Sequence, residues 1–388
     1  MQQNRRTFLS AAAAAALSQS RVLGANDRIR IGVIGCGGRH RELMRALEAS
    51  GGNQVVAACD VYEPRRKATL QRFSGATEYT DHRQLLDNKE IDAVVIATPD
   101  HWHVPITSDA VAAGKDVYVE KPVTHTMEEG DVLIKAVRAT DRIVQCGMQQ
   151  RSWEHFRTAA DMIQSGKIGK VTQVRTYWFQ NYSPRGAVTP VDTSKLDWKR
   201  WLGSAPDQPF DTDRFYVWRW YWDFGGGAMT DLFTHWIDVV HMAMNSDSPR
   251  QAQMLGNKYV FTQRDCPDTM EAAFEYPNFQ VSYDGTMISS VDDGGLQFRG
   301  TEATMKLDRS RLEIFNEGKR SRTPDTEILS KGDGTITHMG NFLDCVRSRK
   351  QPNAPVETGV SAARPGHIAN LAWRKDARWM SQDKLFKG

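Results

Sequence analysis

The stretch Val117-Tyr118-Val119-Glu120-Lys121-Pro122-Val123 begins as an apolar run rich in β-branched residues, which is typical of a buried strand. The run ends in an acid, a lysine and a proline, and strand pairing stops there because proline has no N–H. In open α/β sheets, ligands bind at the carboxyl ends of the strands. We therefore expect Lys121 to lie at a ligand site, with a nucleotide-binding half before it and a substrate-presenting half after it.

The region near the start of the chain contains a strand, a glycine loop and a helix in that order. The strand is expected over 29–34, the loop is Gly35-Cys36-Gly37-Gly38-Arg39, and an amphipathic helix is expected over 42–50. Glycines in such a loop let the backbone turn and approach a pyrophosphate, which would lie at the helix N-terminus. His40 stands where the third glycine of a GxGxxG fingerprint is expected, so the dinucleotide motif is partial.

A second strand, expected over 54–60, ends in Asp60. An acid at this place accepts hydrogen bonds from the ribose hydroxyls of NAD and repels a 2′-phosphate. Arg65 and Arg66 follow closely and could instead meet that phosphate. The sequence therefore favours NAD and leaves NADP as the alternative.

Strands and helices keep alternating as far as residue 148. Buried strands are expected over 91–97 and 143–146, with helices over 104–113 and 127–140 between them. This alternation is typical of a parallel, doubly wound sheet. We therefore expect a Rossmann dinucleotide-binding domain over 27–148.

The pattern changes after residue 149. Longer strands with alternating polarity are expected at 171–181, 252–262, 270–276, 279–287, 295–300, 303–307 and 311–315. Short turns join most of them, so the sheet should be largely antiparallel. Helices are expected at 154–165, 338–349 and 357–375, and the segment 184–213 is expected to be a long loop. The predicted fold class is α/β: a Rossmann domain, then an α+β domain over 149–388 with a large open, mostly antiparallel sheet.

Composition limits the class of protein. The chain has 388 residues, of which 40% are hydrophobic and 25% are charged, as in ordinary globular proteins with two domains. The net charge of +3 comes without a basic stripe, so we expect no nucleic-acid partner. The five cysteines lack CxxC spacing, which favours buried thiols over a disulfide framework or a zinc site. No apolar run is long enough for a membrane helix, so we expect no membrane anchor.

Residues 1–25 resemble a twin-arginine signal peptide. Arg5 and Arg6 precede Phe8 and Leu9, and an alanine-rich run follows over 11–17. Such a leader is an address read by an export receptor. We therefore expect export of the folded protein to the periplasm, and the alternative is a disordered basic tail.

A second informative stretch places Gly225-Gly226-Gly227 directly before an expected helix. On that helix Asp231, His235 and Asp238 would share one face, and the glycines would let a ligand approach the backbone. An acid one turn before a histidine can orient the imidazole and stabilise its protonated form. The alternatives are a solvated polar face, a buried histidine with satisfied hydrogen bonds, and a two-histidine, one-carboxylate metal site that includes His241.

Five motifs occur in a fixed order: Gly35-Cys36-Gly37-Gly38, Ala97-Thr98-Pro99 with His103, Glu120-Lys121-Pro122, Ser165-Gly166-Lys167-Ile168-Gly169, and Gly225-Gly226-Gly227 with Asp231 and His235. Together they resemble the Gfo/Idh/MocA family of glucose–fructose oxidoreductase and inositol 2-dehydrogenase. The resemblance covers residues from about 29 to 350. It implies a Rossmann domain and a second α/β domain whose open sheet often packs against another subunit, and hence a homo-oligomer.

The resemblance also implies functional residues. The catalytic set would be Lys121, Asp231 and His235. Cofactor contacts would come from the glycine loop and the strand ends: Gly35, Cys36, Gly37, Gly38, Arg39, Asp60, Thr98, Pro99, His103, Glu120 and Lys121. Substrate contacts are expected from the catalytic set together with Arg151 and Trp178. Seven of the eleven tryptophans fall between Trp178 and Trp236, and sugar C–H faces stack on such rings, although core packing explains them equally well.

The family's chemistry is hydride transfer between a sugar or cyclitol carbon and nicotinamide. By resemblance, His235 would take the hydroxyl proton, Asp231 would orient His235, and Lys121 would hydrogen-bond the same oxygen. A protein exported in folded form would have to carry a tightly held cofactor. We favour a sugar oxidoreductase. The alternatives are a redox-neutral glycoside hydrolase that works through oxidation, elimination, hydration and re-reduction, and a family member that only binds a sugar.

Overall fold

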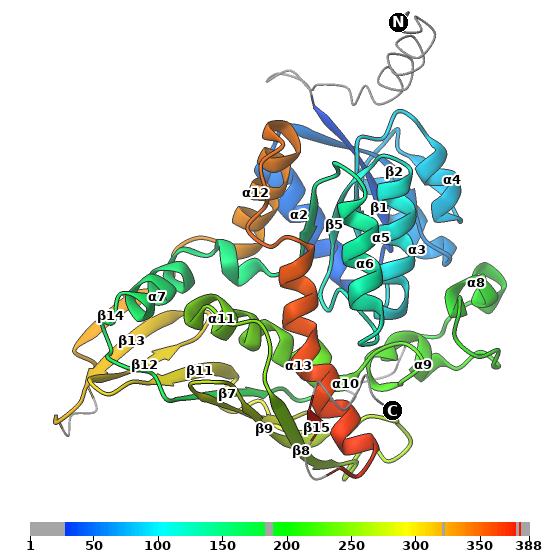
Figure 1. The fold of residues 1–388 in the computed structure, drawn as a ribbon. Helices are drawn as coiled ribbons and strands as arrows, with labels where there is room; N and C mark the ends of the chain where they lie inside the picture. The colour runs from blue at the N-terminus through cyan, green and yellow to red at the C-terminus, as the bar shows by residue number, and fades with distance from the viewer. Residues whose placement is uncertain (1–27, 183–188, 320–322, 378–379, 382–388) are drawn as a thin grey trace, which may run out of the picture.

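The computed structural model describes residues 28–182, 189–319, 323–377 and 380–381. These residues form two lobes, one around each of two sheets, and the long helix α13 (Val356–Arg374) runs between them (Figure 1). The expected signal segment 1–25 lies outside the described residues, so export stays a prediction. Among the described helices, none is long and apolar enough to cross a membrane.

The first lobe is built on a sheet of six parallel strands. They are β1 (Ile29–Ile34), β2 (Asn53–Cys59), β3 (Thr77–Tyr79), β4 (Ala93–Ile96), β5 (Asp116–Val119) and β6 (Val144–Cys146). Their order is β3-β2-β1-β4-β5-β6. The chain builds the sheet outward from β1 on one side, through β2 and β3, and then outward on the other side, through β4, β5 and β6, so the strand order reverses between the neighbours β1 and β4. The predicted doubly wound Rossmann sheet is confirmed, and its ligand crevice is expected at that reversal.

Helices cover both faces of this sheet. They are α2 (Gly38–Ser50), α3 (Glu63–Arg72), α4 (His82–Asp87), the short 3-10 helix η2 (Asp100–Trp102), α5 (His103–Ala112) and α6 (Glu129–Arg138). Leu43 and Leu47 of α2 pack in one core cluster, and Ile106 of α5 and Leu133 of α6 in the other. Each of these buried side chains contributes roughly 1.5–3 kcal/mol of hydrophobic stabilisation.

One helix from late in the chain returns to the first lobe. We expected everything after residue 149 to form the second domain, but α12 (Gly334–Ser348) packs against α2. Its Met339, Phe342 and Leu343 are buried in the same cluster as Ile31 of β1. The first lobe is therefore discontinuous in sequence, because its sheet needs this helix to cover one face.

The second lobe is built on a sheet of nine strands. They are β7 (Gln173–Phe179), β8 (Gln251–Asn257), β9 (Thr269–Glu275), β10 (Gln280–Thr286), β11 (Gly294–Arg299), β12 (Ala303–Leu307), β13 (Arg311–Asn316), β14 (Thr326–Leu329) and β15 (Met380–Ser381). Their order is β14-β13-β12-β11-β7-β10-β9-β8-β15. Every pair is antiparallel except β7 with β10, so the mostly antiparallel sheet is confirmed.

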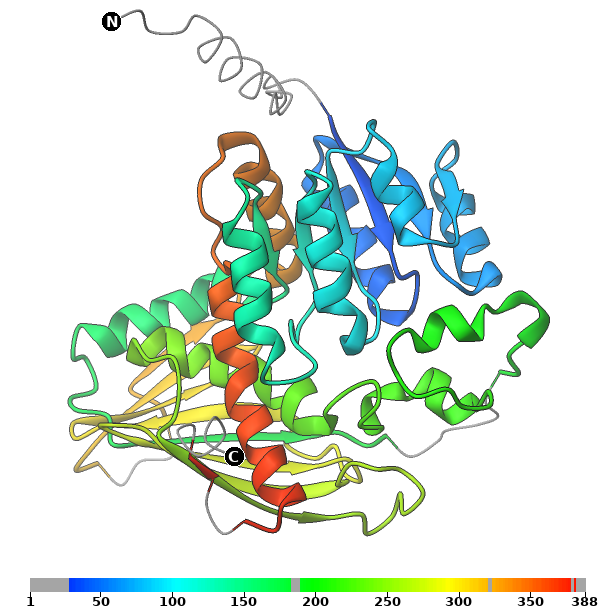
Figure 2. The same cartoon turned by 45° about the vertical axis from the view of Figure 1, so that its right-hand side comes forward.

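Helices cover one face of this sheet. After the 3-10 helix η3 (Gln149–Ser152) come α7 (Glu154–Gln164) and α11 (Phe233–Met244), which lie with α13 above the sheet in Figures 1 and 2. In β9, Met270, Ala272 and Phe274 point into this layer and are buried, while the alternate residues are more exposed. No described element covers the opposite face, and oligomerisation through it stays a prediction.

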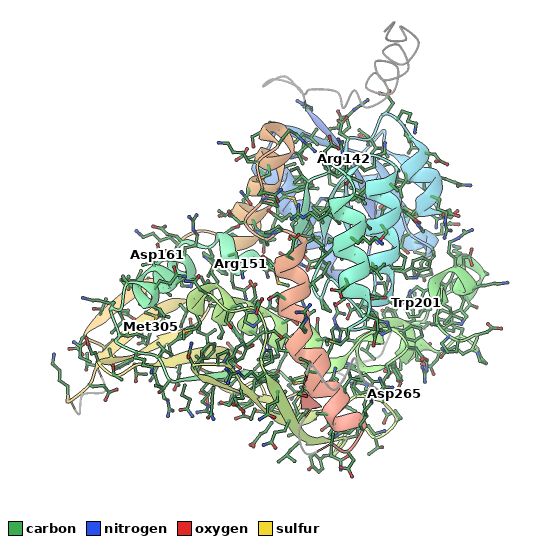
Figure 3. The ribbon with its side chains drawn as sticks, viewed as in Figure 1. Arg142, Arg151, Asp161, Trp201, Asp265 and Met305 are labelled. Atoms are coloured by element: carbon green, nitrogen blue, oxygen red, sulfur yellow. The ribbon has the colours of Figure 1, made fainter. Side chains whose placement is uncertain are left out.

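A segment rich in aromatic residues, which we name the aromatic insertion (residues 189–224), extends from the second lobe to the first. It holds η4 (Thr193–Lys195), α8 (Trp198–Leu202), α9 (Thr212–Tyr216) and η5 (Trp218–Trp220). The expectation of a long loop over 184–213 is therefore wrong for its described residues, 189–213. Its Trp201 (labelled in Figure 3) stacks on Trp198 at 4.6 Å between ring centres. The Trp201 carbonyl oxygen accepts a hydrogen bond from Trp102 Nε1 of the first lobe (2.9 Å).

Candidate active site

A cavity of about 1110 Å³ opens between the two lobes. Its walls are the glycine loop after β1, the residues after β4 and β5, the aromatic insertion and the start of α11. Ligand sites typically enclose about 300–1,000 Å³, so this volume suits a dinucleotide with a small second ligand. The cavity therefore lies where the strand order predicts a ligand.

The glycine loop has the geometry of a phosphate cradle. Gly35 has φ +86°, and a Cβ there would lie 2.7 Å from the carbonyl carbon of Ala97, so only glycine fits. Helix α2 begins at Gly38, where an added Cβ would meet nothing within 4 Å. The N-terminus of a 13-residue helix therefore opens toward the cavity, where its dipole favours an anion.

His40, which replaces the third fingerprint glycine, has a structural role. Its Nε2 lies 3.1 Å from Thr69 Oγ1 of α3, and the ring is buried. Burial, with a smaller effect of Arg72, lowers the pKa of His40 to about 4. The ring is therefore neutral at neutral pH and joins α2 to α3 without adding charge beside the phosphate cradle.

Asp60 lines the cavity and also braces the loop. Its two carboxylate oxygens accept hydrogen bonds from the N–H groups of Cys36 (2.7 Å) and Tyr62 (2.8 Å). Arg66 turns inward, where its guanidinium donates to the Asp60 carbonyl oxygen (2.6 Å). Arg65 lines the cavity, with its guanidinium carbon 4.5 Å from the centre of the Phe215 ring. Of the two arginines considered for a 2′-phosphate, Arg65 is the one that faces the cavity.

His103 connects the ends of two neighbouring strands. Its Nε2 lies 3.0 Å from the Thr98 carbonyl oxygen, and its Nδ1 lies 2.7 Å from the Pro122 carbonyl oxygen. Thr98, Pro99 and His103 all line the cavity. Because both ring nitrogens face backbone carbonyls, His103 shapes the segments after β4 and β5.

Glu120 anchors the glycine loop to the end of β5. It is almost fully buried, and its Oε1 accepts from Arg39 Nε at 2.8 Å. Arg39 Nη2 is buried without a hydrogen-bond partner among the described residues. The Arg39–Glu120 pair therefore joins the phosphate cradle directly to the residue before Lys121.

Lys121, Asp231 and Arg219 form a partly buried charge cluster on the substrate-lobe side of the cavity. Lys121 Nζ donates to Asp231 Oδ1 (2.5 Å) and to the Asp231 carbonyl oxygen (2.7 Å), and Arg219 Nε lies 3.2 Å from the same Oδ1. Burial alone would raise the pKa of Asp231, but the two cations outweigh it and lower that pKa to about 2. Asp231 is therefore a carboxylate that fixes the ammonium of Lys121.

His235 lies in the same cavity but is not oriented by Asp231. The helix that the sequence predicts is split, since α10 (Gly227–Asp231) ends at Asp231 and α11 begins at Phe233. The His235 ring stacks on Trp178 instead, at 5.7 Å between ring centres and 25° between planes. Burial, and then the nearby Lys121, hold the pKa of His235 well below its usual value, so the ring is neutral and able to accept a proton.

The three glycines before α10 serve packing. Gly227 has φ +66°, and a Cβ there would lie 2.7 Å from the Cβ of Cys266. None of Gly225-Gly226-Gly227 lines the cavity. The expectation that a ligand approaches their backbone is therefore not met: the glycines let the chain turn closely past its own neighbours.

One residue expected at the substrate lies outside the cavity, and three residues that were not expected line it. Arg151, expected at the substrate and labelled in Figure 3, pairs with Asp238 at 2.7 Å and does not line the cavity. Gln149, Arg219 and Arg309 do line it. Sequence reasoning missed these three because they lie in separate segments without a shared motif.

The cavity residues fit a dinucleotide. Five polar atoms of cavity-lining residues are buried without partners in the described part of the chain: Arg39 Nη2, Thr98 Oγ1, Asp100 Oδ1, Gln149 Oε1 and His235 Nδ1. Such atoms call for a ligand or water. Together with the open end of α2, they are suited to NAD and a hydroxylated second ligand. Within the described ranges, no group of three or more His, Cys, Asp or Glu side chains could hold a metal ion.

Two family models match the chain. Residues 29–148 match the Gfo/Idh/MocA model described as an oxidoreductase family with an NAD-binding Rossmann fold. Residues 156–306 match the model of the Gfo/Idh/MocA C-terminal domain. These matches support the NAD assignment made from the glycine loop and Asp60.

Individual proteins are similar as well. Inositol 2-dehydrogenase 2 of Saccharopolyspora erythraea is 31% identical over 181 residues, which are 45% of this chain and 53% of that protein. The 1,5-anhydro-D-fructose reductase of Ensifer adhaerens is 21% identical over 336 residues, 85% of this chain and 92% of that protein. The chain spans about half the length of the curated inositol dehydrogenases that it matches.

Solved structures share the fold. Levoglucosan dehydrogenase, in complex with NADH and levoglucosan, superposes with a TM-score of 0.74 at 18% identity, covering 92% of this chain and 99% of that one. At this identity the likeness supports the two-lobed architecture. The chemistry must come from the residues in the cavity.

Proposed function

The chain belongs to the Gfo/Idh/MocA family of oxidoreductases, and on this premise we propose that it transfers a hydride between a hydroxyl-bearing carbon of a sugar or cyclitol and NAD. One observation carries the proposal. Two side chains line the same cavity as the phosphate cradle: Lys121, whose ammonium is held by the Asp231 carboxylate, and His235, whose imidazole is neutral. A proton acceptor beside a fixed hydrogen-bond donor is what oxidation of an alcohol requires from the protein.

Each residue has a role that follows from its contacts. His235 accepts the hydroxyl proton, and its stacking on Trp178 keeps the ring in place. Lys121 uses two N–H groups on Asp231, which leaves the third for the substrate oxygen, where negative charge develops. When bound, NAD supplies the hydride acceptor.

The substrate class rests on the walls of the cavity and on the names of the similar proteins. Trp178 contributes an aromatic side chain to a site that also holds hydrogen-bonding side chains such as Gln149 and Gln180. A polyhydroxylated ring presents both C–H faces and hydroxyls, which match such a wall. The similar curated proteins act on inositol and on an anhydro sugar, by their names.

We also propose that the cofactor stays bound between turnovers. The aromatic insertion contributes Trp201, Phe215 and Tyr216 to the wall around Asp60 and Arg65, where the adenosine end would lie. Such a cover slows dissociation. It suits a protein exported by the twin-arginine route, as the segment 1–25 suggests, because the folded protein would take its cofactor along.

The test begins with the full chain purified without added nucleotide. Extraction of the denatured protein should release NAD, and the loaded protein should form NADH and a keto product with myo-inositol, D-glucose or D-galactose. Lys121→Ala should lower turnover by roughly 10²–10⁴-fold, as is typical of a lost hydrogen-bonding or acid–base group. Lys170→Ala, at an exposed position outside the cavity, is the matched control.

Two results would contradict the proposal. Protein that neither carries a dinucleotide nor binds added NAD would remove the cofactor assignment. Release of nitrophenol from 4-nitrophenyl glycosides, without a keto sugar, would replace the oxidoreductase by a redox-neutral hydrolase.

A further inference from the structure

Arg309 places a cation at the substrate corner of the cavity. It lies in the turn between β12 and β13, is exposed to solvent, and lines the cavity. Its guanidinium carbon lies 4.9 Å from the ring centre of Trp178 and 5.9 Å from that of Trp236. Since Trp178 also stacks on His235, Arg309 and the proposed base share one aromatic platform.

Asp308, next to Arg309 in the sequence, and the cavity carboxylates Glu120 and Asp231 are engaged elsewhere. Asp308, its neighbour in sequence, folds back on the turn, where its Oδ1 accepts from the N–H groups of Ser310 (2.6 Å) and Arg311 (2.9 Å). Glu120 binds Arg39 at 2.8 Å. Asp231 binds Lys121 and Arg219, as described above.

Arg309 therefore has no ion-pair partner among the described residues. Desolvation inside the cavity, together with the neighbouring Arg39, lowers the pKa of Arg309 to about 10, so it is still charged at neutral pH. An exposed guanidinium that lines the cavity without a counter-ion is available to an anionic ligand. The planar guanidinium offers two parallel N–H donors, which match a carboxylate.

We propose that Arg309 binds an anionic substituent of the substrate, so that acidic sugars with a carboxylate, such as hexuronates, are the preferred substrates. The inference rests on the proposed function, because it names the substrate class of the same site. A carboxylate at Arg309 would place the sugar ring along Trp178 and bring a ring hydroxyl toward His235 and Lys121. A sugar phosphate offers similar chemistry, and the experiment separates it from a carboxylate.

The probes are D-glucuronate, D-glucose 6-phosphate and D-glucose, which differ only at C6, with the matching galacto and manno series. Two quantities are measured on NAD-loaded full-length protein. One is equilibrium binding, followed by tryptophan fluorescence, since Trp178 is in the platform. The other is kcat/KM from the formation of NADH.

Arg309→Gln is compared with wild type and with Arg311→Gln. Arg311 lies in the strand after the same turn but pairs with Glu327 at the surface, so its change should leave binding and turnover as they are. Wild type should favour the hexuronate over the neutral hexose by roughly 10- to 100-fold, the range for a hydrogen bond to a charged group. Arg309→Gln should collapse this preference, and Arg309→Lys should restore part of it, because the charge returns without the planar fork.

The outcomes separate the two hypotheses. If NADH forms equally well from neutral and acidic sugars, or if the preference survives in Arg309→Gln, the inference is wrong while the oxidoreductase stands. If hexuronates bind with an Arg309-dependent preference but no NADH forms, Arg309 does bind the anionic substituent and the proposed function fails. A preference for D-glucose 6-phosphate alone would show that the anionic group bound by Arg309 is a phosphate and not a carboxylate. Loss of NAD retention in Arg309→Gln, with unchanged sugar preference, would assign Arg309 to the cofactor instead.

Discussion

His235 is positioned by an aromatic ring and not by a carboxylate. Asp231 is four residues earlier, but its carboxylate is shared by Lys121 and Arg219. The proton acceptor His235 and the charge cluster around Asp231 are therefore positioned independently of each other. Stacking on Trp178 restrains the imidazole, and burial, together with the cations around the ring, holds the pKa of His235 well below the usual value.

This arrangement predicts the pH dependence of sugar oxidation. His235 must be neutral to accept a proton, so activity falls as the pH falls through its pKa. Because that pKa lies well below 6.5, we expect the acid limb of kcat/KM against pH to lie below pH 6.5. His235→Gln should remove this limb and lower turnover by roughly 10²–10⁴-fold, while NAD binding is kept.

A control for this prediction lies on the same helix. His241 is buried beside Tyr276, with Nε2 2.7 Å from the hydroxyl, and does not line the cavity. His241→Gln should keep both the turnover and the acid limb. An acid limb at or above pH 6.5 in wild type, or full turnover in His235→Gln, would remove His235 as the base.

At the residue scale, the sequence located the reactive side chains but not their pairing. The spacing of Asp231 and His235 predicts two neighbouring side chains, and both line the cavity, but the Asp231 carboxylate is engaged by Lys121 and Arg219. The ion pair from Lys121 to Asp231 joins residues 110 positions apart, which no local pattern can show. Arg309 carries no motif either, since its importance depends on which carboxylates are already engaged.

At the scale of elements, the aromatic insertion is the feature that sequence periodicity missed. Its short helices lack the length for an amphipathic pattern, so they resemble a loop in sequence. They are ordered by a small core of their own, in which Trp201, Phe215, Tyr221 and Phe224 are buried. This core docks on the first lobe through Tyr62 and Leu196, which are joined by a β-bridge.

If the insertion retains the cofactor, Phe215→Leu should weaken NAD binding. Phe215 lines the cavity and carries the guanidinium of Arg65 at 4.5 Å. A cation over an aromatic ring contributes about 0.5–2 kcal/mol, so we expect the Kd for NAD to rise by roughly 2- to 30-fold. Isothermal titration of protein stripped of nucleotide measures this change.

Phe210→Leu is the matched control for the insertion. Phe210 packs on the same cluster, 6.1 Å from Phe215 between ring centres, but does not line the cavity. Because Phe210 is only partly buried, Phe210→Leu should lower stability less than Phe215→Leu does, and it should leave the Kd unchanged. Equal Kd values for both variants would mean that the insertion acts only as a structural brace.

At the scale of the whole molecule, the alternation of strands and helices was enough to predict the parallel sheet and its crevice. It was not enough to predict which late elements return to it. Helix α12 covers the first lobe, and α13 buries Val360 in the first lobe and Ile368 in the second. Such long-range contacts depend on apolar surfaces that fit each other in space, and a single sequence does not show which surfaces will meet.

Both lobes bury histidines in neutral form. Nine of the ten histidines have a lowered pKa, in each case with burial as the largest cause. For five buried rings the pKa falls to about 3 or about 4: His40, His101, His241, His338 and His367. In the unfolded chain these rings take up protons below pH 6.5, whereas in the folded protein they stay neutral until about pH 4.

The protein should therefore lose stability between about pH 6.5 and pH 4, before ordinary carboxylates titrate. The unfolded state binds more protons in this window, so the free energy of unfolding falls as the pH falls. At about pH 5 each such histidine lowers the free energy of unfolding by about 2 kcal/mol, and five together approach the whole stability of about 5–15 kcal/mol.

Urea denaturation at about pH 7.5 and about pH 5 measures this loss of stability. His367→Gln, which can keep the contact to Thr124 Oγ1 (3.0 Å), should reduce the difference between the two pH values by one histidine's share. Equal free energies of unfolding at both pH values would mean that these rings are not held neutral by the fold.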